Sequence, residues 1–210
     1  MPEVALSALD PGLQKLATQV RTSLEQGNHD FVIAASRQIL AAHPGCLVVR
    51  RWERQARIQK SPRGRSFLGR AKGGLKLARG LWGQKKTSPD AAASLTTADA
   101  ILALDPWSAG GLKQLAAAAA ELDLPATEIF AFQCWCEAEP DNREAGLALT
   151  AACLRVGDLT AAMAAVEVLR LKHPHDGDVQ EALRNVAVAQ TVQTGRWDEG
   201  GASFRDQRRE

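Results

Sequence analysis

The feature that most constrains the fold is the spacing of four prolines. Pro106, Pro140 and Pro174 are separated by 34 residues each, and every one follows a helix-like run of residues. Pro44 stands in a similar phrase, "LAAHPGC". Because proline cannot continue a helix, each of these positions predicts the place where a helix has stopped. A fixed period of 34 residues predicts a chain built from repeated structural units.

Two glycines divide the repeated unit in half. Gly27 precedes Pro44 by 17 residues, and Gly157 precedes Pro174 by the same number. Glycine is typical of the residue that follows a helix, because it adopts the left-handed backbone conformation at little cost. Each unit is therefore predicted to contain two helices joined by a tight turn. The chain contains no tyrosine, and alanine and leucine dominate, a composition that also favours helices.

Apolar side chains recur at helical spacing inside these units. The stretch "IFAFQCWCEAE" places apolar residues at spacings of three and four, namely Ile129, Phe132, Trp135 and Cys136. This spacing predicts one buried stripe per helix, with Trp135 as the largest anchor of its unit. A single hairpin buries such a stripe only against its neighbours, so the units are expected to stack.

The units resemble tetratricopeptide repeats, which are 34-residue helix hairpins with small or bulky apolar residues at set positions and proline at position 32. Three prolines in strict register carry the resemblance, and in the unit from Ala109 an aspartate, Asp123, replaces the turn glycine. The matching positions are Leu149, Gly157, Leu159, Ala162, Val166, Leu169 and Pro174 in the unit from Arg143; Leu112, Leu115, Phe132 and Pro140 in the unit from Ala109; Leu16, Gly27, Ile39 and Pro44 in the unit from Leu13; and Leu81, Ile101 and Pro106 in a divergent unit from Leu75.

The resemblance implies an all-α fold, a right-handed superhelical solenoid of antiparallel helix hairpins over residues 1–195. A last helix at about 177–194 is expected to cap the array, with Gly195 ending it. Residues 196–210 are predicted to be a short C-terminal tail. In that tail we expect Trp197 to fold back onto the last helix pair.

An extra segment interrupts the array. Pro44 and Pro106 are 62 residues apart, which exceeds one period by 28. We assign the extra length to a basic insert at about residues 46–74, with a helix at about 47–59 and a turn-rich stretch at 60–65. The first helix of the next unit is then predicted at about residues 75–87.

Positive charge is concentrated in and around this insert. Residues 50–86 hold 13 of the 26 Lys and Arg residues and a single acid, Glu53. The basic patch comprises Arg50, Arg51, Arg54, Arg57, Lys60, Arg63, Arg65, Arg70, Lys72, Lys85 and Lys86. For the stretch at 66–86 three interpretations remain open: a divergent repeat helix whose cations pair with acids elsewhere, a surface for acidic peptide or nucleic acid, and an interfacial membrane helix that uses Phe67 and Trp82.

No arrangement typical of an enzyme is present. The glycine-rich "GRAKGGLKLARG" lacks the spacing of a phosphate-binding loop. Cys46, Cys134, Cys136 and Cys153 fall in or beside predicted helices and are expected to be reduced, packed thiols, because they lack the spacing of metal ligands. We therefore predict no catalytic residue, no metal site and no cofactor.

The resemblance also implies a function. Tetratricopeptide proteins present first-helix residues to a peptide or helix in a concave groove, so we predict a non-catalytic scaffold or adaptor whose partner is a protein or peptide with an acidic amphipathic segment. The groove positions that carry over are Arg21, Lys76, Arg79, Lys113, Gln114, Glu144, Leu147, Ala151 and Arg155. The carboxylate clamp that grips chaperone tails is not expected, because Ala117 and Ala148 stand where it needs asparagines.

Nucleic-acid binding through residues 50–86 is the alternative function, and an anionic membrane surface ranks third as a partner. No small-molecule substrate is expected. The N-terminal "MPEVALSALDPGLQ" lacks the features of a signal peptide, and no long uncharged apolar run occurs, so a cytoplasmic location is predicted.

Overall fold

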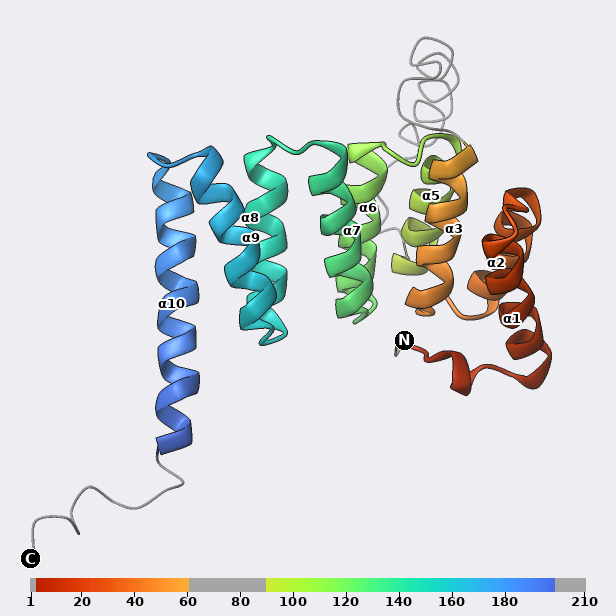
Figure 1. Ribbon diagram of the computed structural model, residues 1–210, viewed down its shortest axis with the longest axis horizontal. Helices are drawn as coiled ribbons and strands as arrows, with labels where there is room; N and C mark the ends of the chain where they lie inside the picture. Colours follow the sequence, from red (N-terminus) through yellow and green to blue (C-terminus); the bar gives the residue numbers. More distant parts are fainter. Residues whose placement is uncertain (1–2, 61–89, 199–210) are drawn as a thin grey trace, which may run out of the picture. The chain divides into compact units, whose positions relative to one another are not determined.

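A computed structural model describes residues 3–60 and 90–198, and all regular structure in these ranges is helical (Figure 1). The chain divides into two compact units, Met1–Ala138 and Glu139–Glu210. The first unit contains η1 (Leu6–Ala8), α1 (Pro11–Glu25), α2 (His29–Ala42), α3 (Leu47–Lys60), α5 (Ala91–Leu104), α6 (Ala109–Glu121) and α7 (Pro125–Ala138). The second contains α8 (Arg143–Arg155), α9 (Leu159–Lys172) and α10 (Gly177–Asp198). The predicted all-α class is confirmed.

Side-chain caps explain where many of these helices begin. Asn, Asp or Ser precedes the first residue of five helices, and its side-chain oxygen accepts a hydrogen bond from a backbone N–H of the first turn. The capping residues are Asn28 for α2, Asp90 for α5, Ser108 for α6, Asn142 for α8 and Asp158 for α9. The same local chemistry therefore starts helices in both units.

The turns between paired helices lie where the sequence predicts them. Gly27 and Gly157 have φ values of 77° and 76°, in the left-handed region that glycine enters without steric cost. Asp123 occupies the corresponding place between α6 and α7 with φ of 56°. Aspartate tolerates this conformation better than most residues, so the turn survives without glycine.

Helix starts reproduce the 34-residue period. Ala109, Arg143 and Gly177 open α6, α8 and α10, and α7 and α9 start at Pro125 and Leu159. Within the first unit α6 packs against α7, and within the second α8 packs against α9, as antiparallel pairs. The predicted helix hairpins with a 34-residue period are confirmed for α6–α7 and α8–α9.

Among the described residues of the first unit, buried apolar side chains form two separate cores. One lies among α1, α2 and α3 and includes Val20, Val32 and Ile39. The other lies among α5, α6 and α7 and includes Leu115 and Leu124. Helix α3 covers residues that the sequence predicts to be a basic helix, and it contributes Val49 and Ala56 to the first core.

Helices α3 and α5 run in the same direction (Figure 1). Arg50 contacts Asp99, and Arg57 further along α3 contacts Ala103 further along α5, which is the order that parallel helices produce. The pair is therefore not an antiparallel hairpin. The connecting residues 61–89, which include the helix predicted at 75–87, lie outside the described part of the chain.

Helix α10 corrects one prediction. It continues through Gly195 to Asp198 rather than ending at Gly195. A glycine inside a helix costs only about 1 kcal/mol relative to alanine, too little by itself to stop a helix. The Trp197 side chain and residues 199–210 lie outside the described residues, so the predicted docking of the tail stays a prediction. None of the described helices is long and apolar enough to cross a membrane.

The packing of α8 against α9 gives a first testable expectation at Gly146. A Cβ at this position would lie 2.5 Å from Cδ2 and 2.7 Å from Cγ of buried Leu169. We expect Gly146→Ala to lower the free energy of unfolding by about 1 to 3 kcal/mol through overpacking, although alanine favours the helix. Gly12→Ala, where a Cβ would meet nothing within 4 Å, is the matched control in urea melts. Equal stability of the two variants would contradict the tight contact.

Candidate functional site: an arginine-lined seam

Helix α3 carries a cationic face opposite its apolar one. Arg50, Arg54 and Arg57 are four and three residues apart, so they share one side of the helix. That side faces α5–α7, while Val49 and Ala56 on the other side belong to the core with α1 and α2. We use the name arginine seam for these three arginines together with their hydrogen-bond and ion-pair partners on α3, α5 and α7 and in the loops before α3 and α6.

Arg50 is the most buried cation of the seam. Its side chain is 4% exposed, and its guanidinium donates hydrogen bonds to the Asp99 carboxylate on α5 and to the carbonyl oxygen of Pro44, the latter at 3.2 Å. The Asp99 side chain is 33% exposed. Burial of a charge is tolerated only when it is paired and hydrogen-bonded, so Asp99 and Pro44 allow α3 to present an arginine to the interior.

Arg54 reaches the loop before α6 and the end of α7. It donates to the carbonyl oxygen of Pro106 and, at 3.3 Å, to the carboxylate of Glu137. Its Cζ atom lies 5.1 Å from the centroid of the Trp107 ring, and Cζ of Arg51 lies 5.7 Å from the centroid of Phe130. Both distances are within the range of cation–π attraction. The rings of Trp107, in the loop before α6, and of Phe130, on α7, thus add to the ion pairs that hold α3.

Arg57 lies at the end of the seam, in the last turn of α3. It pairs with Glu53 one turn earlier and donates to the carbonyl oxygen of Ala103 at 3.2 Å. Glu53 also faces Arg37 of α2 at 3.7 Å, so this carboxylate is shared by two arginines. The seam is therefore a layer of polar contacts between two apolar cores.

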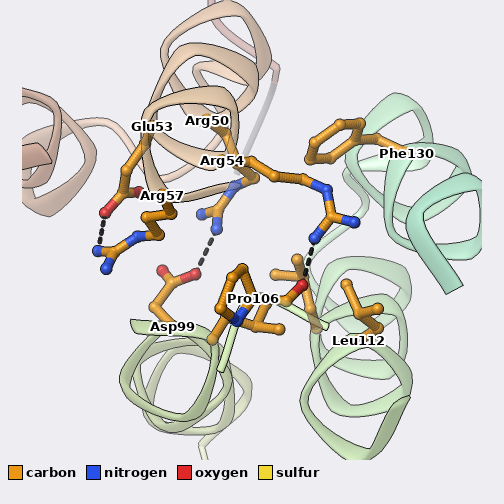
Figure 2. A pocket seen from close by; sticks show the side chains of 10 residues that line it. Arg50, Glu53, Arg54, Arg57, Asp99, Pro106, Leu112 and Phe130 are labelled. Carbon is orange, nitrogen blue, oxygen red and sulfur yellow. Dashed lines mark hydrogen bonds and ion pairs between the residues drawn. The ribbon is translucent and has the colours of Figure 1, made fainter. Parts of the chain in front are cut away.

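A cavity of about 30 Å³ lies within the seam (Figure 2). Figure 2 shows the Arg50 and Arg54 side chains projecting from α3 toward Asp99 and Pro106, with Leu112 and Phe130 nearby. The lining residues are Arg50, Glu53, Arg54, Arg57, Asp99, Leu102, Pro106, Leu112, Leu115 and Phe130. The space suits one or two water-sized groups and is too small for an organic cofactor.

One buried thiol, that of Cys134, lies close enough to the seam to sense the charge of Arg54. Burial raises the pKa of Cys134 on α7 to about 12, against the opposing effect of the nearby Arg54 charge. The thiol is therefore neutral at ordinary pH, and thiols react as thiolates. Within residues 3–60 and 90–198, no three His, Cys, Asp or Glu side chains are grouped so that they could hold a metal ion.

The structure places the described members of the predicted basic patch in two settings. Arg50, Arg54 and Arg57 lie in the seam with their partners. Arg51 and Lys60 are exposed, and Lys60 pairs with Asp30 of α2. Composition alone suggests a uniform cationic surface on α3, whereas the spacing of four and three residues is the signal that indicates a single inward face. The remaining patch residues, Arg63, Arg65, Arg70, Lys72, Lys85 and Lys86, lie outside the described residues.

The predicted groove residues of the first unit fall on two helices. Arg21 on α1 is exposed and pairs with Glu25. On α6, the Lys113 ammonium lies 4.3 Å from the centroid of the Trp135 ring, and Gln114 donates to the carbonyl oxygen of Ser94 at 3.3 Å. Gln114 therefore joins α6 to α5. Lys76 and Arg79 fall in the segment that the structure does not describe.

In the second unit the predicted groove residues form one stripe on α8. Glu144, Leu147, Ala151 and Arg155 are three or four residues apart, and Leu147 is half-buried while the other three are exposed. The opposite side of the helix, which includes Cys153, is buried.

No family model and no curated protein matches the sequence. Among solved structures, the first TPR of Spaghetti (RPAP3) bound to the HSP90 peptide SRMEEVD is 15% identical, with 59% of this chain and 92% of that chain covered and a TM-score of 0.42. MamA protein is 13% identical, with 87% and 85% covered and a TM-score of 0.43. The TPR2AB domain of yeast Sti1 in its pHSP90 complex is 17% identical, with 84% and 67% covered and a TM-score of 0.43. Likeness at this level concerns the arrangement of helices and carries no argument about partners.

Proposed function

We propose that the protein is a non-catalytic adaptor that binds an acidic amphipathic segment of another protein on the exposed faces of its first helices. One observation carries the proposal: α6 and α8 each bury one face and expose the other. On α6, Leu112 and Leu115 are buried while Lys113 is exposed. On α8, Cys153 is buried while Ala151 is exposed.

The chemistry of the exposed α8 stripe suits an amphipathic helix or an extended peptide. Leu147 and Ala151 provide apolar surface, and Glu144 and Arg155 stand at the two ends of the stripe. Helix-binding surfaces of this kind combine apolar anchor positions with charges that set the direction of the ligand. Arg155 supplies positive charge for an acidic residue of the partner.

Two of the matched structures are complexes with HSP90 sequences. The proposal does not extend to a chaperone tail, because Ala117 and Ala148 stand where a carboxylate clamp of the tetratricopeptide type needs asparagines. It rests on the exposed faces of this chain's own helices.

The test compares two alanine-to-glutamate variants of α8 and α9 in the same unit. The partner is first identified by affinity purification from the host and mass spectrometry, and its affinity is then measured with purified proteins. We expect Ala151→Glu to weaken binding by about tenfold or more, because it places a like charge opposite an acidic segment and covers apolar surface. Ala164→Glu on α9, also at an exposed position, should bind as wild type does.

A charge-reversal variant extends the test to the first unit. Replacing Lys76, Arg79 and Lys113 by glutamate should abolish partner capture with helical content unchanged in circular dichroism. Wild-type affinity in both this variant and Ala151→Glu would remove the binding site from the first-helix faces.

The alternative is nucleic-acid binding through residues 50–86. It draws on the charge of that segment, although three of its cations, Arg50, Arg54 and Arg57, are engaged in the seam. Phosphate contacts release counterions, so affinity would fall steeply with salt. Failure to retain nonspecific DNA or RNA at low salt would exclude this function.

A further inference from the structure

The lining of the seam cavity carries more positive than negative charge. Three guanidinium groups line it with two carboxylates, those of Glu53 and Asp99, while Glu137, the partner of Arg54, is mostly exposed outside the lining. Within the described part of the chain, the Nε–H group of Arg50 has no hydrogen-bond acceptor, although this side chain is only 4% exposed. A buried donor without an acceptor is unfavourable, so this position favours a ligand that can accept a hydrogen bond.

We propose that the cavity binds one carboxylate group, held by Arg50 and Arg54 with Arg57 beside it. A carboxylate supplies acceptor oxygens for the donors of the lining, and guanidinium groups match its planar geometry. The cavity of about 30 Å³ has room for about two water-sized groups, which is the size of the two carboxylate oxygens.

The apolar part of the lining specifies what the carboxylate is attached to. Leu102, Leu112, Leu115 and Phe130 border the same cavity. Their surfaces suit a short aliphatic stem, such as that of a small free carboxylate or of an aspartate or glutamate side chain from another protein. The site lies among α3 and α5–α7, and none of its residues belongs to the α8 stripe, so the inference stands independently of the adaptor proposal.

The Asp99 carboxylate competes with this ligand for the donors of Arg50. It accepts from Arg50, and the same negative charge repels an incoming carboxylate. Two substitutions therefore have opposite expected effects. Arg50→Lys keeps the charge but removes the Nε–H donor and the planar geometry, whereas Asp99→Asn removes the repulsion and frees donors of Arg50.

The experiment measures acetate binding to the full chain by saturation-transfer NMR, with chloride exchanged for acetate at constant ionic strength. We expect saturable binding to the wild type, a loss of affinity of about tenfold or more in Arg50→Lys, and a gain of several-fold in Asp99→Asn. Arg143→Lys, at an exposed ion pair with Asp176 in the other unit, should leave the affinity unchanged. Circular dichroism establishes that each variant is folded.

A fluorescein-labelled hexaglutamate peptide distinguishes the two sources of the carboxylate. Peptide binding that Arg50→Lys weakens and acetate displaces assigns the site to an acidic side chain. Acetate binding without Arg50-dependent peptide binding assigns it to a small free carboxylate. Equal acetate affinity in the wild type and Arg50→Lys overturns the proposal. Should Arg50→Lys not fold, acetate affinity that does not rise in Asp99→Asn overturns it instead.

Discussion

Trp135→Ala should lower the free energy of unfolding by about 3 to 5 kcal/mol, the range for removing a large aromatic side chain from a packed core. Trp135 is 2% exposed on α7, its ring lies 6.4 Å from that of Phe132, and the Lys113 ammonium stands 4.3 Å from its centroid. The substitution removes the apolar contacts and the cation–π attraction together. Both losses act in the same direction, which places the effect among the largest expected for this chain.

Urea unfolding followed by circular dichroism measures this effect. Val168→Ala on α9, where the side chain is about half exposed, is the control and should change stability by less than about 0.5 kcal/mol. A loss below about 1 kcal/mol for Trp135→Ala would mean that the ring is not an anchor of its hairpin.

Arg50→Ala should lower the free energy of unfolding by about 3 kcal/mol, at the lower end of the range for breaking a buried ion pair. The variant leaves the Asp99 carboxylate and the Pro44 carbonyl oxygen without their donor. Asp99 is one-third exposed, so water partly compensates its charge and the upper end of the range does not apply.

Arg21→Ala is the control for this prediction, because the Arg21–Glu25 pair lies at the surface. Exposed pairs contribute little, so its unfolding free energy should change by less than about 1 kcal/mol. The double variant of Arg50 and Asp99 should recover part of the loss, since it leaves no buried charge alone. Identical urea midpoints for the Arg50 and Arg21 variants would show that the seam does not stabilise the first unit.

Local sequence patterns predict the stripe on α8 but not the arginine seam. The stripe on α8 follows from helical spacing alone, because residues three and four apart share a face wherever the helix lies. The seam, in contrast, depends on which residues lie beside α3 in the folded chain. No local pattern relates Arg50 to Asp99, which is 49 residues away, or Arg54 to Glu137, which is 83 residues away.

By itself the sequence determined the helical class, the 34-residue period and the positions of the turns. Prolines, glycines and capping side chains act within a few residues of where they stand, so Gly157 and Asn142 have the same local effect in any tertiary setting. Asp123 shows that the period also tolerates a replacement at the turn. The tertiary structure decided the direction of α3 against α5 and the burial of its arginines. Those depend on which acids, carbonyl oxygens and aromatic rings distant segments place beside α3, because a buried charge is stable only where such partners are present.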